Sequence, residues 1–146
     1  MNIVRRTLIC VSILLISGSI LFMFGMLLWA YRLDADLSGS YAPSQVAMAR
    51  FHAQFWSMFF AAAKFGLAGC LGLSATLTSG TVLKVGALTL GGAFASLIFD
   101  FLSTGPHDWS GATGFTITFV LLCAGLALLA IGSVRVGWQR LQRAAV

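Results

Sequence analysis

The chain has 146 residues, of which 59% are hydrophobic and only 9% are charged. Soluble domains contain about 45–50% apolar and about 25% charged residues. A soluble domain of about 150 residues buries only roughly 70% of the surface that its unfolded chain exposes, so it cannot hide this much apolar surface. The composition excludes an ordinary soluble domain and predicts an all-α integral membrane protein.

The net charge is +5, which in a soluble protein suggests nucleic-acid binding. Here the basic residues lie at the ends of apolar segments, which is how cytoplasmic anchors are distributed in membrane proteins. We therefore expect the lipid bilayer to surround the chain, and we expect no nucleic-acid partner.

A membrane-spanning helix needs about 20 mostly apolar residues. Four segments meet this requirement: residues 8–31, 53–77, 85–102 and 111–134. The first is longer than the usual apolar core of a signal peptide, about 7–15 residues, so we expect it to be retained. Little of the chain is left for anything else, so residues 1–146 form a single membrane domain, an up-down bundle of four helices with short loops.

The second helix is predicted to start well before its apolar part. Pro43 cannot continue a helix, and the hydroxyl of Ser44 can cap the first free backbone N–H groups. A helix from Gln45 to the end of the second segment would be about 50 Å long. It therefore protrudes from the bilayer, tilts or kinks.

The distribution of charge predicts the orientation. Six of the nine basic residues fall on one side if the helices alternate in direction: Arg5, Arg6, Lys84, Arg135, Arg140 and Arg143. All four acidic residues lie on or near the other side. Because cytoplasmic loops carry the excess of Lys and Arg, we expect both termini in the cytoplasm, with the bacterial inner membrane as the default location.

Small residues predict where the helices approach one another. Lipid tails are as apolar as leucine, so helices in a bilayer associate through close backbone contact and hydrogen bonds. Five glycines at helical spacing mark such contacts: Gly66, Gly69, Gly72, Gly91 and Gly132. We expect them to serve contacts within the bundle, although the same pattern also suits self-association or docking to a larger complex.

Lys64 and Asp100 are the charged residues inside the apolar segments. Counted from the inner ends of their helices, they lie about 20 Å and about 24 Å into the membrane. A lysine stem can bridge that difference, so we expect an intramembrane ion pair between two hairpin neighbours. Ser57 and Ser96 share helical faces with Lys64 and Asp100 and extend the polar site. The pair either locks the hairpin or serves as a proton, ion or substrate site.

Catalytic and cofactor motifs are absent from the sequence. His52, His107 and Asp108 gather near the outer interface, but no close-spaced ligand pair accompanies them. The three cysteines lie inside apolar segments without metal or redox spacing, and the chain contains no glutamate. We therefore expect no catalytic residue, no metal site and no cofactor.

The leading hypothesis is a non-catalytic membrane protein that acts as an accessory or assembly subunit of a larger inner-membrane complex. It rests on the missing catalytic chemistry and on the small residues along the helices. The alternative is a small oligomeric transporter or channel that uses Lys64 and Asp100. The partners are then other membrane subunits in the first case and further copies of the chain in the second.

Overall fold

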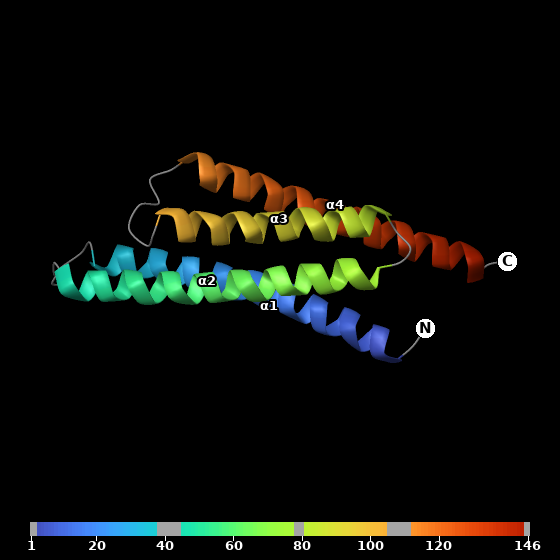
Figure 1. The fold of residues 1–146 in the computed structure, drawn as a ribbon, viewed down its shortest axis with the longest axis horizontal. Coiled ribbons are helices and arrows are strands. Elements are labelled where there is room, and N and C mark those ends of the chain that lie inside the picture. Colours follow the sequence, from blue (N-terminus) through green and yellow to red (C-terminus); the bar gives the residue numbers. More distant parts are fainter. Residues whose placement is uncertain (1–2, 38–44, 78–80, 105–111, 145–146) are drawn as a thin grey trace.

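The computed structural model describes residues 3–37, 45–77, 81–104 and 112–144. These residues form four helices: α1 (Ile3–Leu37), α2 (Gln45–Thr76), α3 (Thr81–Thr104) and α4 (Ala112–Ala144). Figure 1 shows them side by side along the long axis of the molecule. The predicted all-α class is confirmed for the described part of the chain.

Each of the four helices is long and apolar enough to cross a membrane. The apolar stretches are Ile3–Trp29, Gln54–Thr76, Thr81–Ser103 and Thr116–Arg143. The shortest of them has 23 residues, or about 35 Å of helix, which exceeds the roughly 30 Å of hydrocarbon in a bilayer. Four candidate spans were predicted, and the described residues contain four.

The helices extend beyond the predicted segments. α1 includes five more residues at its start and six more at its end than residues 8–31, and α4 continues ten residues past position 134. Charged and polar residues end the apolar pattern without ending the helix, because Arg and Gln are good helix formers in water. The predicted start of α2 at Gln45 is confirmed, whereas the proposed cap, Ser44, lies outside the described residues.

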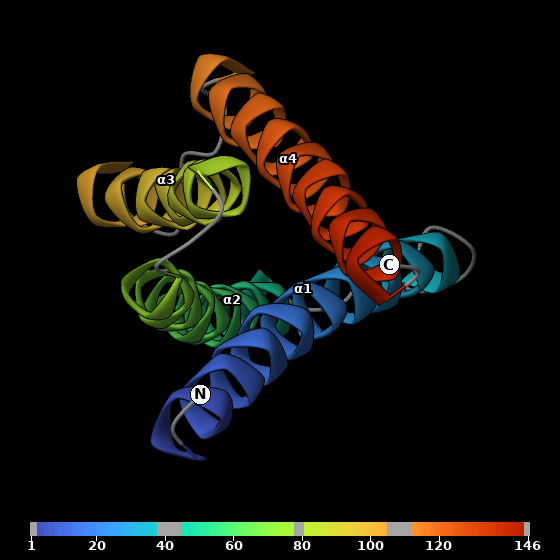
Figure 2. The ribbon, with the colours of Figure 1, turned by 90° about the vertical axis from the view of Figure 1, so that its right-hand side faces the viewer.

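The bundle is open. Consecutive helices run in opposite directions, and the two chain ends lie at the same end of the molecule (Figure 1). α1 packs on α2, α2 on α3 and α3 on α4, and within the described ranges no other pair of helices is in contact. Figure 2, a view along the bundle, shows α1 and α4 crossing their neighbours at an angle instead of closing a square. The predicted up-down order is therefore present without a closed core.

The central helices are more buried than the outer ones. Within the most apolar window of each helix, 44% of α2 and 39% of α3 is buried, against 22% of α1 and 17% of α4. The large side chains that are fully buried are Leu90 and Phe94 of α3 and Cys70 of α2. The core therefore lies between α2 and α3, and the outer helices present most of their surface to the surroundings.

One narrow face of α1 contacts α2. Its four buried residues and two of its half-buried ones recur at alternating intervals of three and four: Ile9, Ser12, Ile16, Ser19, Met23 and Met26. This spacing is that of a coiled-coil seam, in which a single face meets one neighbouring helix. Leu15 and Ile20 are half-buried beside these residues. The rest of the circumference of α1 is exposed, and it carries large apolar side chains such as Leu14, Leu21 and Phe24.

A side chain of α1 caps the end of α2. The Nε–H group of Arg5 donates a hydrogen bond to the carbonyl oxygen of Thr76, at 2.9 Å. The last carbonyls of a helix have no partner inside it, and the end of the helix carries partial negative charge. Arg5 supplies a donor to one of these carbonyls and a positive charge at the helix end, and so it links α1 to α2 at the end where the chain termini lie.

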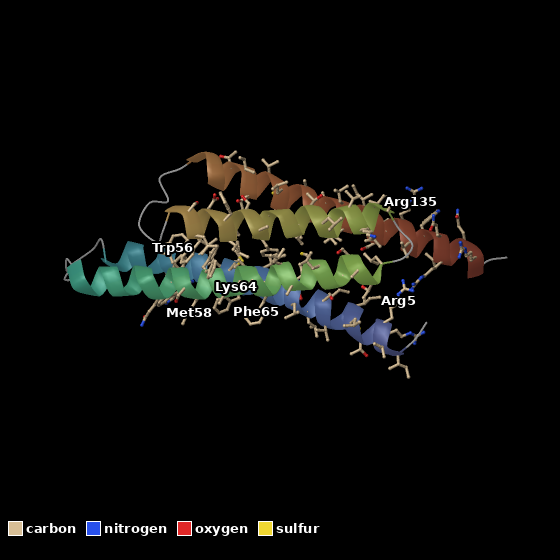
Figure 3. The ribbon with its side chains drawn as sticks, viewed as in Figure 1. Arg5, Trp56, Met58, Lys64, Phe65 and Arg135 are labelled. Carbon is tan, nitrogen blue, oxygen red and sulfur yellow. The ribbon has the colours of Figure 1, made fainter. Side chains whose placement is uncertain are left out.

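Basic residues gather at that same end. In Figure 3, Arg5 of α1 and Arg135 of α4 lie near the chain termini. Arg6, Arg140 and Arg143 belong to the terminal turns of α1 and α4, and all three are exposed. This arrangement agrees with the charge pattern from which a cytoplasmic position of both termini was predicted.

We predict the direction of insertion from this charge bias. A reporter fused after residue 146 or within residues 78–84 should report the cytoplasm, and one near residue 40 or 105 should report the opposite side. Reporter fusions with compartment-specific activity measure this. A C-terminal fusion active on the outer side would contradict the orientation.

Candidate functional site

The glycines of α2 contact two different neighbours. A Cβ atom added to Gly66 would lie 2.5 Å from the ring of Phe94 in α3. One added to Gly69 would lie 2.8 Å from the backbone oxygen of Ser12 in α1, and one added to Gly72 would meet the Ser12 hydroxyl at 2.6 Å. The predicted row of glycines is thus divided, with one contact toward α3 and two toward α1.

The glycines of α3 and α4 lie at close helix contacts as well. Gly91 faces Cys70 of α2, whereas Gly132 of α4 faces Leu83 of α3. Gly125, seven residues before Gly132, lies against backbone: an added Cβ would lie 2.7 Å from the backbone nitrogen of Leu90. The contact residues on both helices are seven residues apart, so α4 uses one face against α3.

We predict that even a methyl group at Gly125 separates α3 from α4. Gly125→Ala should lower the free energy of unfolding by about 1–3 kcal/mol, the usual cost of overpacking. Gly137→Ala on the same helix is the matched control, because nothing lies within 4 Å of its added Cβ. Alanine favours a helix over glycine by about 1 kcal/mol, so the control should be at least as stable as the wild type. Thermal unfolding in detergent compares them, and equal stability of the two variants would refute the close contact.

The two predicted serines do not join one polar site. The Ser57 hydroxyl donates to the carbonyl oxygen of Gln54 in its own helix, at 2.9 Å. Ser96 instead accepts a hydrogen bond from the Thr118 hydroxyl, at 3.0 Å, which links α3 to α4. Ser96 is therefore a helix–helix contact, and Ser57 remains on the same exposed face as Lys64.

Lys64 lies in the middle of α2 with its side chain exposed (Figure 3). It is ten residues from Gln54 and twelve from Thr76, the ends of the apolar stretch, or about 15 Å and about 18 Å along the helix. Its ammonium nitrogen lies 4.2 Å from the centre of the Phe60 ring. A cation at this distance over an aromatic face is attracted to the ring.

Asp100 is half-buried on α3, next to Phe101. The Phe101 ring stacks on Phe60 with the ring centres 4.5 Å apart, so α2 and α3 meet close to both charged residues. The structure places the Lys64 ammonium on Phe60, and it records no ion pair between Lys64 and Asp100, both of which it describes. The ion pair therefore stays a prediction.

The exposed face of α2 around Lys64 consists mainly of small and polar residues. Its members recur at intervals of three and four, and all are exposed: Gln54, Ser57, Ala61, Lys64, Ala68, Leu71 and Ala75. We call these seven residues the outward stripe of α2. Spacing of this kind places them along one line on the helix, the geometry that a second helix can follow.

The outer helices expose a different kind of surface. Exposed residues of α1 include Leu14, Leu21 and Phe24, and those of α4 include Ile131 and Val134. Large apolar side chains of this type are compatible with lipid, whereas small residues and polar side chains are enriched where membrane helices meet. Because α4 also exposes small residues at helical spacing, at Cys123, Ala127 and Ala130, the charge of Lys64 at mid-span is what distinguishes the outward stripe from the remaining exposed surface.

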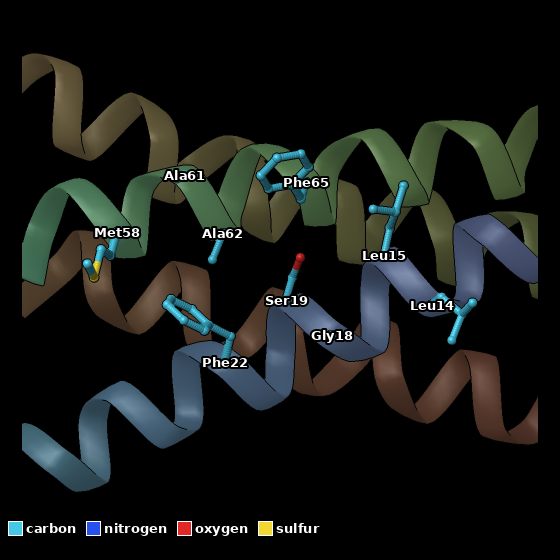
Figure 4. A pocket seen from close by; sticks show the side chains of 9 residues that line it. All are labelled: Leu14, Leu15, Gly18, Ser19, Phe22, Met58, Ala61, Ala62 and Phe65. Carbon is cyan, nitrogen blue, oxygen red and sulfur yellow. The ribbon is translucent and has the colours of Figure 1, made fainter.

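A groove between α1 and α2 adjoins the stripe (Figure 4). It has a volume of about 440 Å³ and an almost entirely apolar lining. Nine side chains or backbone segments line it: Leu14, Leu15, Gly18, Ser19, Phe22, Met58, Ala61, Ala62 and Phe65. Ala61 belongs to both the groove and the stripe, so the two features form one continuous surface.

The sequence alone did not predict this surface. Its signal was present in the alternating spacing of Ser57, Ala61, Lys64 and Ala68, but that pattern resembles the one that marks a buried face. Among the described residues no three His, Cys, Asp or Glu side chains could hold a metal ion together. His107, Asp108 and the side chain of His52 lie outside the described part.

Comparison with protein-family models, with curated proteins and with solved structures found no protein that matches this chain. The candidate site therefore rests on the geometry of the chain itself: an exposed lysine at mid-span, the small residues above and below it, and the groove beside it.

Proposed function

We propose that the protein is a non-catalytic accessory or assembly subunit of a larger complex in the membrane. In this proposal both termini lie in the cytoplasm and the membrane is the bacterial inner membrane. The exposed position of Lys64 at mid-span is the observation that supports it best, because a lone cation facing lipid is an unfavourable arrangement that a second membrane protein can relieve.

The free-energy cost of placing Lys64 in the membrane supports the proposal of a partner subunit. A lysine at the centre of a membrane helix costs about 2.5–3.5 kcal/mol on insertion scales. A cation–π contact such as that with Phe60 returns about 0.5–2 kcal/mol. The insertion cost exceeds the return from the cation–π contact over the whole of both ranges. A polar or acidic group from another subunit would offset it, and intramembrane charges commonly find such partners.

The shape of the molecule supports the same reading. An open row of four helices leaves most of α1 and α4 exposed, so neither helix shields a central cavity. The volume beside the stripe is a lateral groove between α1 and α2. Such a surface is suited to packing against other helices. The alternative, a small transporter, would have to form its pathway between several copies of the chain.

We predict that the chain co-purifies with at least one different membrane protein when it is extracted from its native membrane in mild detergent. Quantitative mass spectrometry should give a fixed ratio between them. Lys64→Met should reduce the retained partner about three- to tenfold, the effect of a modest polar coupling. Lys84→Met removes the same charge near the start of α3 and should leave the ratio unchanged.

Two results would count against the proposal. A chain that purifies alone is not a subunit of a stable complex. A chain that purifies only with further copies of itself would instead favour the oligomeric transporter, and ion or substrate flux in vesicles would then be the measurement to make.

A further inference from the structure

We infer that the outward stripe of α2 binds a transmembrane helix of a different protein, and that this helix carries an Asp or Glu side chain opposite Lys64. The inference rests on the proposed function and adds to it the face that is used and the chemistry of the partner. It follows from three observations: the size of the residues in the stripe, the depth of Lys64, and the groove beside it.

The stripe allows close approach. Ala61, Ala68 and Ala75 are spaced seven residues apart and exposed, so they lie on one line along α2. Small residues at this spacing let a second helix backbone come near, and the van der Waals contact that results is what drives helix association in lipid. On α4 a comparable row of exposed small residues, Cys123, Ala127, Ala130 and Gly137, carries no charge, so the charge of Lys64 distinguishes the outward stripe of α2.

The groove between α1 and α2 forms a recess beside the outward stripe. Gly18 of α1 lines the groove and leaves space in it, since no atom lies within 4 Å of an added Cβ atom. The rims are formed by the larger side chains of Phe22 and Phe65 (Figure 4). A large apolar side chain of a helix that packs on the stripe can enter this space beside Ala61, as a knob enters a hole.

The charge determines the chemistry of the partner. Lys64 is about 15 Å or more from either end of its apolar stretch, too far for its four-carbon stem to bring the ammonium group to the lipid headgroups. Its described contact is the ring of Phe60, which attracts the cation without neutralising it. A carboxylate at the same depth on the docked helix supplies both the opposite charge and hydrogen-bond acceptors.

A second copy of the chain does not meet this requirement through the same face. A two-fold axis along the membrane normal relates equal residues at equal depth. Two stripes that faced each other would therefore bring the two Lys64 side chains together, and like charges repel strongly where water is scarce. The favoured occupant is a helix of another protein.

Site-specific photocrosslinking in the native membrane tests the inference. A diazirine analogue of leucine would replace Leu71, which is exposed on the stripe, and in a separate variant Leu21, which is exposed on α1. We expect Leu71 to crosslink to a membrane-spanning segment of another protein that has an Asp or Glu near its middle. Lys64→Met should lower that crosslink about three- to tenfold. Lys64→Asp combined with Lys at the partner's acidic position should restore it.

A pair of glycine variants separates loss of docking from loss of fold. Gly18→Leu fills the groove and should also lower the Leu71 crosslink. Gly25 lies two turns further along α1, has equally open space around it and does not line the groove. The variant Gly25→Leu should therefore leave the crosslink unchanged. Equal effects of the two variants would overturn the inference.

Other outcomes overturn it as well. A Leu71 crosslink to another copy of the chain, to lipid alone or to a segment without an acidic residue would do so. Recovery of the crosslink when Asp100→Asn is added to Lys64→Met would identify Asp100 as the counter-ion instead. A partner captured from Leu21 but not from Leu71 would leave the proposed function standing and refute the docking face, whereas failure of the chain to co-purify with any different protein refutes both.

Discussion

Close backbone contact at glycine is the interaction on which the packing of the four helices depends. In a bilayer the hydrophobic effect does not bring helices together, because the lipid is as apolar as their side chains. Here Gly69 admits the backbone of α1, and Gly125 and Gly132 admit the backbone of α3. A Cβ atom at any of these positions would lie less than 3.0 Å from an atom of the neighbouring helix, so the two helices would have to shift at that contact.

The same constraint explains why the bundle is open. Each close contact joins a helix to its neighbour in sequence: the glycines of α2 meet α1 and α3, and those of α4 meet α3. Within the described residues α1 and α4 do not contact each other, so the row of helices stays open. α2, in contrast, has three distinct faces: one against α1, one against α3 and the outward stripe. The third face carries the composition of a helix contact without a described helix against it.

Much of the fold was predictable from the sequence, because apolar length and glycine spacing are local signals. Four helices and the start of α2 at Gln45 were predicted correctly, and the five glycines lie at helix contacts. The full length of α1 and α4 was underestimated, since a change from apolar to polar residues marks the membrane boundary and not the end of a helix.

The direction in which the Lys64 side chain points could not be predicted from the sequence. Position along a helix gives depth in the membrane, but the rotation of the helix, which decides whether Lys64 faces inward or outward, is set by the packing of Gly66 on Phe94 and of Gly69 on Ser12.

The central claim is that protein, and not lipid, covers the outward stripe of α2. Labelling of the native membrane with a photoactivatable carbene probe dissolved in the hydrocarbon tests it directly, with mass spectrometry to locate the modified residues. Exposed residues of α1 and α4 such as Leu21 and Val134 should be modified equally in the wild type and in Lys64→Met. Ala61 and Ala68 should be protected in the wild type and become modified in Lys64→Met. Equal modification of these two alanines in both proteins would contradict the account, because the stripe would then face lipid.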